Sequence, residues 1–268
     1  MKEIKSLFSV LIPVYNERRH IQRNLREVRL TLEELGCKYE IIVIDDGSSD
    51  GSYDAVKELT NEIPRLIVKK NPKNFGKGRA LKKAFKYASG DFIVWLDADL
   101  DLHPFQTKTL YDTMVLNNAD IVIGSKIHPN SRVNYPLTRR IISWGYYIFI
   151  WFLFNLPCHD TQTGIKLFRR EVLDKVFPRI LVKKFAFDLE VLVNAHKLGF
   201  SIVEAPVVLE NKRNYGRIGL YSILSVFWDT LAVWYRMYVL RYYDRINYHR
   251  NKNLRKEFRR VRKQMPEA

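Results

Sequence analysis

Cysteine and histidine are scarce in this chain of 268 residues, which contains two cysteines and six histidines. Cys37 and Cys158 lie far apart and form no CxxC pattern, so the sequence argues against a disulfide framework and a zinc ribbon. The histidines suggest no zinc site either. A reducing, cytosolic compartment fits this composition best.

Long apolar runs are also missing. No window of about 20 residues is both apolar and uncharged, as a simple transmembrane helix requires. The segment Ile141–Leu156 is uncharged but short, and its many aromatic residues favour a membrane-facing surface over an ordinary core helix. Asp229 and Arg236 interrupt a second apolar segment, Ile218–Leu240. The run Leu7–Val14 is too short to predict a signal peptide.

Acidic residues are too few to balance the basic ones, since 45 Lys and Arg face 29 Asp and Glu and leave a net charge of +16. This excess calls for a polyanionic partner: nucleic acid, an anionic membrane or a phosphorylated substrate. Arg241–Lys263 alone holds ten basic and two acidic residues, and its apolar residues recur at helical spacing, which predicts a basic amphipathic helix. No helix-turn-helix, RNP or zinc-finger signature is present, so nucleic acid is the weakest of the three candidates.

Residues 7 to 125 alternate between short apolar runs and segments with helical spacing. The expected strands are Phe8–Ile12, Glu40–Ile44, Arg65–Lys69, Phe92–Leu96 and Ile121–Gly124. The expected helices are Glu17–Leu35, Ser52–Asn61, Gly78–Ala88 and Phe105–Asn117. This alternation predicts an α/β fold with a mainly parallel sheet flanked by helices. Ligands of such sheets bind beyond the carboxyl ends of the strands.

Acidic clusters follow three of the expected strands. They lie in the segments Pro13–Glu17, Asp45–Gly51 and Asp97–Asp101. Carboxylates that converge repel one another unless a cation or hydrogen-bond donors share the site. Asp97 and Asp99, in an Asp-x-Asp pattern, suit Mg²⁺ or Mn²⁺ bridging phosphates. For Asp50 and Asp54, a role in capping a helix or shaping a turn is the better interpretation.

The segment Asn74–Arg79 opens an expected helix with two glycines and two cations. Glycines let the backbone approach an anion closely, while Lys77 and Arg79 supply charge. The segment is not a Walker A sequence, and alone it is weak evidence. Beside three acidic strand ends it suggests a nucleoside diphosphate.

Several motifs occur together in a characteristic order: PVYNE, VIDDGSSDGS, NFGKGRALKKAF, ASGDFIVWLDADLDLHP and DIVIGSK. In this order and spacing they resemble family 2 glycosyltransferases of the Rossmann-like GT-A fold. Three further segments, Arg139–Ser143, Asp160–Phe168 and Phe187–Glu190, resemble the branch that glycosylates dolichyl phosphate or another polyprenyl phosphate. That branch includes dolichyl-phosphate mannose synthase and dolichyl-phosphate β-glucosyltransferase, and DTQTGIKLF is closer to the latter. The resemblance predicts a catalytic domain over residues 1–217, followed by a membrane-associating helical segment over 218–268.

The resemblance also implies a role for each matching residue. The donor nucleotide would be bound by Pro13, Tyr15, Glu17, Asp45, Asp46, Lys77, Asp97 and Ala98. The acceptor phosphate would be held by Lys126, Arg139, Ser143 and Arg213. Asp99 and Asp101 would ligate Mg²⁺ or Mn²⁺, and Asp97, Asp99 and Arg139 would be the catalytic residues. Lys126 stands where relatives often carry Arg, which keeps the charge but loses the bidentate fork.

The implied reaction is inverting transfer of one sugar from UDP-glucose or GDP-mannose to a polyprenyl phosphate. A phosphomonoester has a second pKa of about 6, so it is already a nucleophile and needs no general base. Asp188 and Glu190 are then expected to orient neighbouring groups. A soluble or glycan hydroxyl acceptor is the alternative, and it would require Asp188 as the base. A basic nucleic-acid-binding protein and a degenerate scaffold are weaker interpretations.

Two histidines, His103 and His159, lie beside these motifs. His103 follows the Asp-x-Asp cluster and either approaches the metal and diphosphate or only shapes the turn. His159 is expected to be structural.

A water-insoluble acceptor predicts a monotopic or peripheral protein on the cytosolic face of a membrane, with both apolar segments at the interface and the basic tail on anionic head groups. The sequence leaves the donor and the oligomeric state open.

Overall fold

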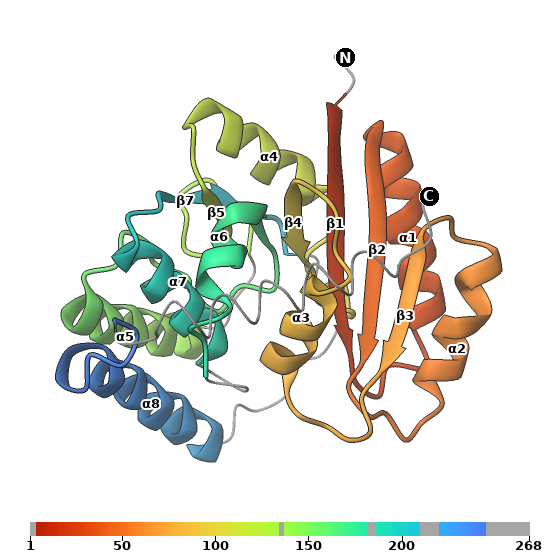
Figure 1. Ribbon diagram of the computed structural model, residues 1–268. Helices are drawn as coiled ribbons and strands as arrows, with labels where there is room; N and C mark the ends of the chain where they lie inside the picture. Colours follow the sequence, from red (N-terminus) through yellow and green to blue (C-terminus); the bar gives the residue numbers. More distant parts are fainter. Residues whose placement is uncertain (1–3, 134–136, 182–185, 210–219, 245–268) are drawn as a thin grey trace.

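The computed structural model describes residues 4–133, 137–181, 186–209 and 220–244 (Figure 1). A sheet of seven strands, ordered β3-β2-β1-β4-β6-β5-β7, forms the centre of these residues. The strands are β1 Ile4–Val14, β2 Cys37–Asp45, β3 Leu66–Lys70, β4 Phe92–Trp95, β5 Ile121–Ser125, β6 Lys166–Arg169 and β7 Ile202–Pro206. Only β6 runs antiparallel to its neighbours, β4 and β5. The prediction of a mainly parallel α/β sheet is therefore confirmed.

Helices cover both faces of the sheet. They are α1 Ile21–Glu34, α2 Ser52–Glu58, α3 Lys77–Phe85, α4 Gln106–Leu116, α5 Leu137–Phe154, α6 Arg170–Val176, α7 Phe187–Lys197 and α8 Leu220–Trp234. A short 3-10 turn, Leu59–Asn61, extends α2, and a π-helical turn, Tyr235–Val239, extends α8. The nine elements expected between residues 7 and 125 are all present, with ends that shift by a few residues. Strand β6 was not expected, because its four residues are too few to show a period.

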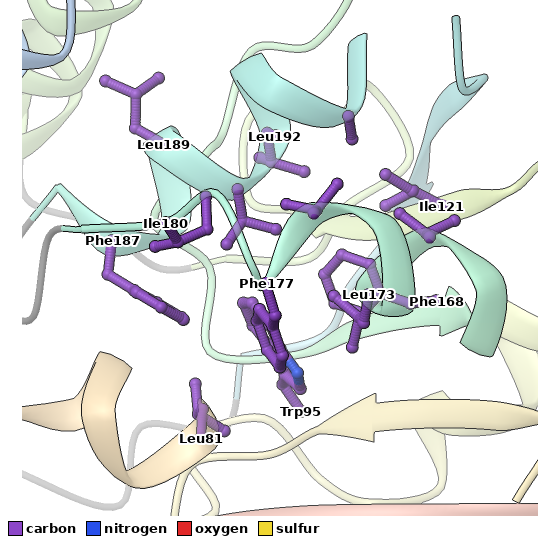
Figure 2. Packing of buried hydrophobic residues seen from close by; sticks show 14 of the residues in the cluster. Leu81, Trp95, Ile121, Phe168, Leu173, Phe177, Ile180, Phe187, Leu189 and Leu192 are labelled. Carbon is purple, nitrogen blue, oxygen red and sulfur yellow. The ribbon is translucent and has the colours of Figure 1, made fainter. Parts of the chain in front are cut away.

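The alternation of side chains along each strand divides the core into two layers. In β4, Ile93 and Trp95 pack in the layer beneath α3, α5, α6 and α7, whereas Val94 packs in the layer beneath α1, α2 and α4. Trp95 is the centre of the first layer, with its ring 4.5 Å from that of Phe168 and 5.5 Å from that of Phe187 (Figure 2). These contacts hold the amino end of α7 against the sheet close to the carboxyl end of β4.

Helix α8 packs on α5 and on the first core layer. The hydroxyls of Tyr146 and Thr230 lie 3.0 Å apart, and the rings of Phe149 and Phe227 lie 4.5 Å apart. After the π-helical turn the chain inserts Tyr243, whose side chain is 1% exposed. The expected domain boundary near residue 218 falls outside the described residues, so that division remains a prediction.

The expected basic helix Arg241–Lys263 differs from the structure where it can be compared. Residues 242–244 form a turn rather than helix, and Arg241 adopts a left-handed backbone with φ 47°, which ends the preceding helical segment. The remaining residues of that prediction lie outside the described part of the chain.

Candidate active site

A pocket of about 300 Å³ lies beyond the carboxyl ends of β1, β2 and β4. Its walls are Pro13, Val14, Tyr15, Glu17, Asp46, Asn74, Gly76, Lys77, Asp97, Ala98 and Asp99. Every residue that the resemblance assigned to the donor nucleotide, except Asp45, lines this pocket. The structure thus brings together four segments that are far apart in sequence, at the edge where parallel sheets bind ligands.

The loops after β1 and β2 are fastened to each other by side chains. Asn16 has a left-handed backbone, with φ 56°, and its N–H donates to the Ser48 hydroxyl at 2.9 Å. In return the N–H of Ser49 donates to the Asn16 side-chain oxygen at 3.1 Å. The N–H of Glu17 donates to the Ser52 hydroxyl at 2.8 Å. These bonds fix the wall of the pocket that carries Tyr15 and Glu17.

The two neighbouring carboxylates of β2 have different tasks. Asp45 is fully buried and accepts hydrogen bonds from the backbone N–H groups of Gly47 and Ser48, so it shapes the turn and does not line the pocket. Asp46 accepts from the N–H groups of Phe75 and Gly76 at 3.0 and 2.7 Å. The sequence did not distinguish them; the structure makes Asp46 the side chain that orders the glycine loop before α3.

The ammonium of Lys77 lies 2.5 Å from a carboxylate oxygen of Asp97 inside the pocket. Burial alone would lower the pKa of Lys77, but the negative charges of Asp97, Asp188 and Asp99 outweigh it and raise that pKa above its usual value. Lys77 therefore stays charged and partly neutralises the acidic cluster. A Cβ atom at Gly164 would lie 2.3 Å from the other oxygen of Asp97, so the carboxylate can sit here only beside glycine.

Helix α1 supports the acidic loop, which is the loop after β4 that carries Asp97 and Asp99. The buried side chain of Asn24 donates to the carbonyl oxygen of Ala98 at 2.8 Å. Two residues on, Leu100 has a left-handed backbone with φ 53°, which is costly for a residue with a branched side chain. Asn24 was not expected at the site, although a polar residue between Ile21 and Leu25 on the apolar side of a helix is a usable signal.

His103 turns away from the pocket. Its Nδ1 accepts from the N–H of Phe105 at 3.1 Å, so Nε2 carries the proton and donates to Glu27 of α1 at 3.0 Å. Neither His103 nor Asp101 lines the pocket. Of the two interpretations of His103, the described structure matches the one in which it shapes the turn.

No group of three His, Cys, Asp or Glu side chains that could hold a metal ion occurs in the described part of the chain. The backbone N–H of Asp101 donates to the side chain of Asp99 at 3.3 Å, and Asp99 reaches the pocket. Mg²⁺ is commonly bound by one or two carboxylates together with water and substrate phosphates. Asp99 with Asp97 fits such a shared site, and the metal roles of Asp99 and Asp101 remain predictions.

A second pocket, of about 580 Å³, lies between β5, α5 and the loop before β6. It is lined by Lys126, Ile127, His128, Pro129, Ser131, Val133, Ser143, Trp144, Asp160 and Gln162. Lys126 and Ser143, which were expected at the acceptor phosphate, both line this pocket. The side chain of Arg139 and all of Arg213 lie outside what the structure describes. The loop Asp160–Gly164 links the two pockets, because it lines this one and ends against Asp97.

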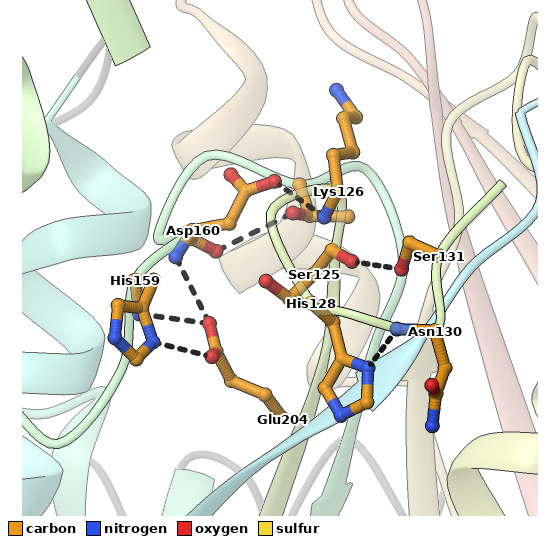
Figure 3. A network of polar contacts seen from close by, with 9 residues as sticks. Ser125, Lys126, His128, Asn130, Ser131, His159, Asp160 and Glu204 are labelled. Carbon is orange, nitrogen blue, oxygen red and sulfur yellow. Dashed lines mark hydrogen bonds and ion pairs between the residues drawn. The ribbon is translucent and has the colours of Figure 1, made fainter. Parts of the chain in front are cut away.

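Glu204 of β7 organises that loop (Figure 3). One of its oxygens accepts from the N–H groups of His159 and Asp160 at 2.8 and 3.0 Å, and the other lies 2.7 Å from Nδ1 of His159. Asp160 in turn accepts from the N–H of Lys126 at 3.0 Å. His159 thus belongs to the scaffold of the second pocket and does not line it.

A buried ion pair lies in the interior, beneath the residues that line the two pockets. Lys166 is fully buried, and its ammonium donates to Asp188 and to the carbonyl of Thr163, each at 2.6 Å. Burial would raise the pKa of Asp188, but the charges of Lys166 and then Lys77 hold it below its usual value. Asp188 is therefore a weak proton acceptor with little access to solvent.

The carboxylate of Glu190, two residues further along α7, contacts the segment that follows α8. It accepts from the hydroxyl of Tyr243 and from the N–H of Leu181 at 3.0 Å. The guanidinium of Arg236 lies 3.9 Å from it. Burial and the charge of Glu190 raise the pKa of Tyr243, so its phenol remains protonated as a donor. Glu190 is thus positioned to anchor the segment that follows α8.

Helices α5 and α8 expose apolar side chains in rows. The exposed residues are Ile141, Ile142, Trp144, Ile148, Trp151 and Phe152 from α5, and Trp228, Leu231, Tyr235, Tyr238, Val239 and Leu240 from α8 and its π-helical turn. Several recur at spacings of three or four residues, namely Trp144, Ile148 and Trp151 in α5 and Trp228, Leu231 and Tyr235 in α8 and its π-helical turn, which places these on one side of each helix. Among the described residues, no helix combines the length and the apolar character that crossing a membrane requires.

The sheet order, and the glycine loop beyond the carboxyl ends of the strands, are typical of α/β proteins that bind nucleotides. Comparison with known proteins is more specific: residues 9–177 match glycosyl transferase family 2, and the chain belongs to that family. It is 32% identical to a dolichyl-phosphate beta-glucosyltransferase of Dictyostelium discoideum over 212 residues, or 74% of this chain and 65% of that protein. A dolichyl-phosphate beta-glucosyltransferase of Trichomonas vaginalis is also 32% identical, over 74% of this chain and 64% of its own length. The chain thus spans slightly less than two thirds of these relatives.

More distant similarities agree on the fold. Glycosyltransferase AglD of Haloferax volcanii is 29% identical over 86% of this chain and 37% of that protein. A crystal structure of glucosyl-3-phosphoglycerate synthase from Mycobacterium tuberculosis with UDP superposes with a TM-score of 0.65 at 18% identity, over 85% of this chain and 80% of that one. This likeness supports a GT-A-like arrangement of sheet and helices.

Proposed function

We propose that this protein transfers one sugar from a nucleotide sugar to dolichyl phosphate or another polyprenyl phosphate. The names of the relatives with 32% identity support a dolichyl-phosphate acceptor. They favour UDP-glucose over GDP-mannose as the donor. The nucleotide would occupy the pocket beside Asp46 and Lys77, and the acceptor phosphate would occupy the second pocket beside Lys126 and Ser143, with Arg139 and Arg213 as further predicted contacts.

The observation that carries the proposal is the ion pair between Lys166 and Asp188. A hydroxyl acceptor needs a carboxylate to remove its proton, and Asp188 was the candidate for this task. Its side chain is 8% exposed and forms an ion pair with a buried ammonium 2.6 Å away. An ionised phosphate needs no such base. The arrangement therefore favours the phosphate acceptor over a soluble or glycan hydroxyl.

The reaction is a direct displacement. An oxygen of the acceptor phosphate forms a bond to the anomeric carbon while the bond from that carbon to the nucleoside diphosphate breaks, and the carbon inverts. Lys77 neutralises part of the charge on the leaving diphosphate, and Asp97 keeps Lys77 charged and in place. The basic side chains of the second pocket align the acceptor.

A divalent cation held by Asp99, with Asp97 or Asp101, would stabilise the departing diphosphate as a Lewis acid. Structures of the mycobacterial glucosyl-3-phosphoglycerate synthase with Mn²⁺ and UDP-glucose support this expectation for the present chain. The ion is Mg²⁺ or Mn²⁺, since both accept carboxylate and phosphate oxygens.

We infer a monotopic or peripheral position on the cytosolic face of a membrane. A polyprenyl acceptor is insoluble in water, so its phosphate must meet the enzyme at the interface. The exposed apolar rows of α5 and α8 provide a surface of the right kind, and residues 218–268 would serve as the membrane-associating segment.

The test is a donor screen with a short-chain polyprenyl phosphate, scored by lipid-linked product. The proposal expects product from UDP-glucose or GDP-mannose, dependent on Mg²⁺ or Mn²⁺. A glycan or sugar alcohol offered in parallel should remain unglycosylated. Transfer to the hydroxyl compound with no lipid-linked product would contradict the proposal.

A further inference from the structure

The segment from Leu66 to Gly90 carries a concentration of positive charge, and the proposed reaction uses only one of these charges, that of Lys77. It contains eight Lys or Arg and no Asp or Glu, so this short segment accounts for half of the net charge of +16 of the whole chain. The segment forms β3, the glycine loop and α3. Only Lys77 of these eight points into the donor pocket and pairs with Asp97.

Contacts between β3 and α3 join six of the other cations into one surface. We call Lys69, Lys70, Lys73, Arg79, Lys83 and Lys86 the cationic face. Lys83 donates to the carbonyl of Lys70 at 2.6 Å, which places α3 against the end of β3. The ammonium of Lys69 lies 5.3 Å from the centre of the Tyr87 ring.

The loop end of the same surface is built on one aromatic ring. The guanidinium of Arg79 lies 3.9 Å from the centre of the Phe75 ring, and the ammonium of Lys73 lies 5.6 Å from it. Phe75 itself is held by its N–H bond to Asp46. The ring therefore fixes two cations beside the mouth of the donor pocket.

Four cations of the cationic face have no ion-pair partner in the described ranges of the chain. Lys69, Lys70, Lys73 and Arg79 are exposed, and none forms an ion pair with another residue in the described ranges. Burial, together with the charges of its basic neighbours, lowers the pKa of Lys83 in spite of nearby Asp46. Concentrated charge of one sign that is left unpaired on a surface is a footprint for a polyanion.

We propose that the cationic face binds the anionic head groups of a membrane while the apolar rows of α5 and α8 enter its interface. The inference rests on the proposed function and adds a second, separate contact to it. Six cations exceed what a nucleoside diphosphate needs for neutralisation. Figure 1 shows the carboxyl ends of β2 and β3, and the loop from β3 to α3, toward the lower end of the molecule. Helices α5 and α8 lie toward the same end, so a single membrane surface can contact the cationic face and the apolar rows together.

The test compares two full-length variants that lose the same charge. One carries Lys69→Gln, Lys70→Gln and Lys73→Gln, and the other carries Arg23→Gln, Lys38→Gln and Lys175→Gln, which are exposed cations on other elements. Binding to phosphatidylcholine vesicles with and without phosphatidylserine is measured by co-flotation at low and high salt. A lysine at an anionic surface contributes about a five-fold affinity, so the first variant should bind roughly 100-fold more weakly than wild type to the anionic vesicles. The second variant should bind like wild type, and the two should bind neutral vesicles equally.

Equal binding of both variants to anionic vesicles would overturn the inference. The inference would also be wrong if the variant of the cationic face bound vesicles normally but bound UDP more slowly at low salt, because the face would then steer the donor. Loss of binding to duplex DNA with unchanged binding to vesicles would reassign the face to nucleic acid. Turnover with a short, detergent-dispersed acceptor tests the proposed function separately: both variants should retain it, and its absence in wild type would reject that function instead.

Discussion

Lys166 and Asp188 form an ion pair of 2.6 Å in the interior, behind the pocket that we assign to the donor. Asp188 lies in the first turn of α7 and Lys166 begins β6, so the pair also joins the helix to the sheet. Removing one partner leaves an unpaired buried charge, which typically costs about 3 to 5 kcal/mol. The pair therefore supports the fold, while it removes Asp188 from the set of available bases.

Acid unfolding should report this pair. The pKa of Asp188 is lowered from 3.8, so its ionisation stabilises the folded state above pH 3.8, and this stability is lost as the pH falls through the lower, folded-state pKa. We expect Lys166→Met to lower the unfolding temperature at pH 7. We expect the double variant Lys166→Met, Asp188→Leu to recover much of it and to show a shallower loss on acidification. Thermal unfolding followed by circular dichroism between pH 7 and pH 3 measures both, and additive losses in the double variant would reject the pair as a coupled unit.

The bond from Asn24 to the carbonyl of Ala98 should set the shape of the acidic loop. Asn24→Asp keeps the shape of the side chain but removes the donor group, so the loop and its left-handed Leu100 lose their support. We expect UDP to bind about ten-fold more weakly in titration calorimetry, which corresponds to a typical loss of about 1.4 kcal/mol. Thr31→Val, a change at another buried polar position of α1, should leave UDP binding unaltered. Equal affinities for Asn24→Asp and wild type would show that the loop holds its shape without α1.

Tyr243 should contribute strongly to the stability of the fold. Tyr243 is buried and donates to Glu190, whereas Leu240 is exposed. A chain that ends after Leu240 should lose several kcal/mol of stability, because it leaves the carboxylate of Glu190 without this donor and opens a cavity. A chain that ends after Asp244 retains Tyr243 and the ion pair of Asp244 with Lys197. It should unfold at a clearly higher temperature than the chain that ends after Leu240. Similar unfolding temperatures for the two truncated chains would contradict this account of Tyr243.

Asp99→Asn should remove activation by divalent cations. The neutral amide is a poor ligand for Mg²⁺ or Mn²⁺, and the lost neutralisation of the diphosphate should lower turnover by at least about 100-fold. Asp101→Asn is the matched control, since Asp101 does not line the pocket, and its effect should be smaller. Mn²⁺-dependent tightening of UDP binding, measured by calorimetry, provides a readout apart from turnover. Unchanged tightening in Asp99→Asn would remove this residue from the metal site.

Local patterns in the sequence predicted much of this structure. The alternation of apolar residues identified β1 to β5 and α1 to α4, and motifs at strand ends identified most walls of the donor pocket. What the sequence did not predict depends on contacts across the fold. Nothing local distinguishes Asp45, which supports a turn, from Asp46, which holds a loop about thirty residues away. Likewise, only tertiary packing reveals that Tyr243, in an expected basic tail, is buried.

The most direct test of the central claim is the pH dependence of turnover in wild type and Asp188→Asn, with saturating donor and a short-chain polyprenyl phosphate. Both proteins should be assayed at a temperature where circular dichroism shows them folded. If the ionised acceptor is the nucleophile, both profiles should fall on acidification with the phosphate pKa of about 6, and the turnover of Asp188→Asn should remain within about ten-fold of wild type. A loss of a thousand-fold or more in Asp188→Asn, with UDP binding intact, would contradict the account and make Asp188 the base.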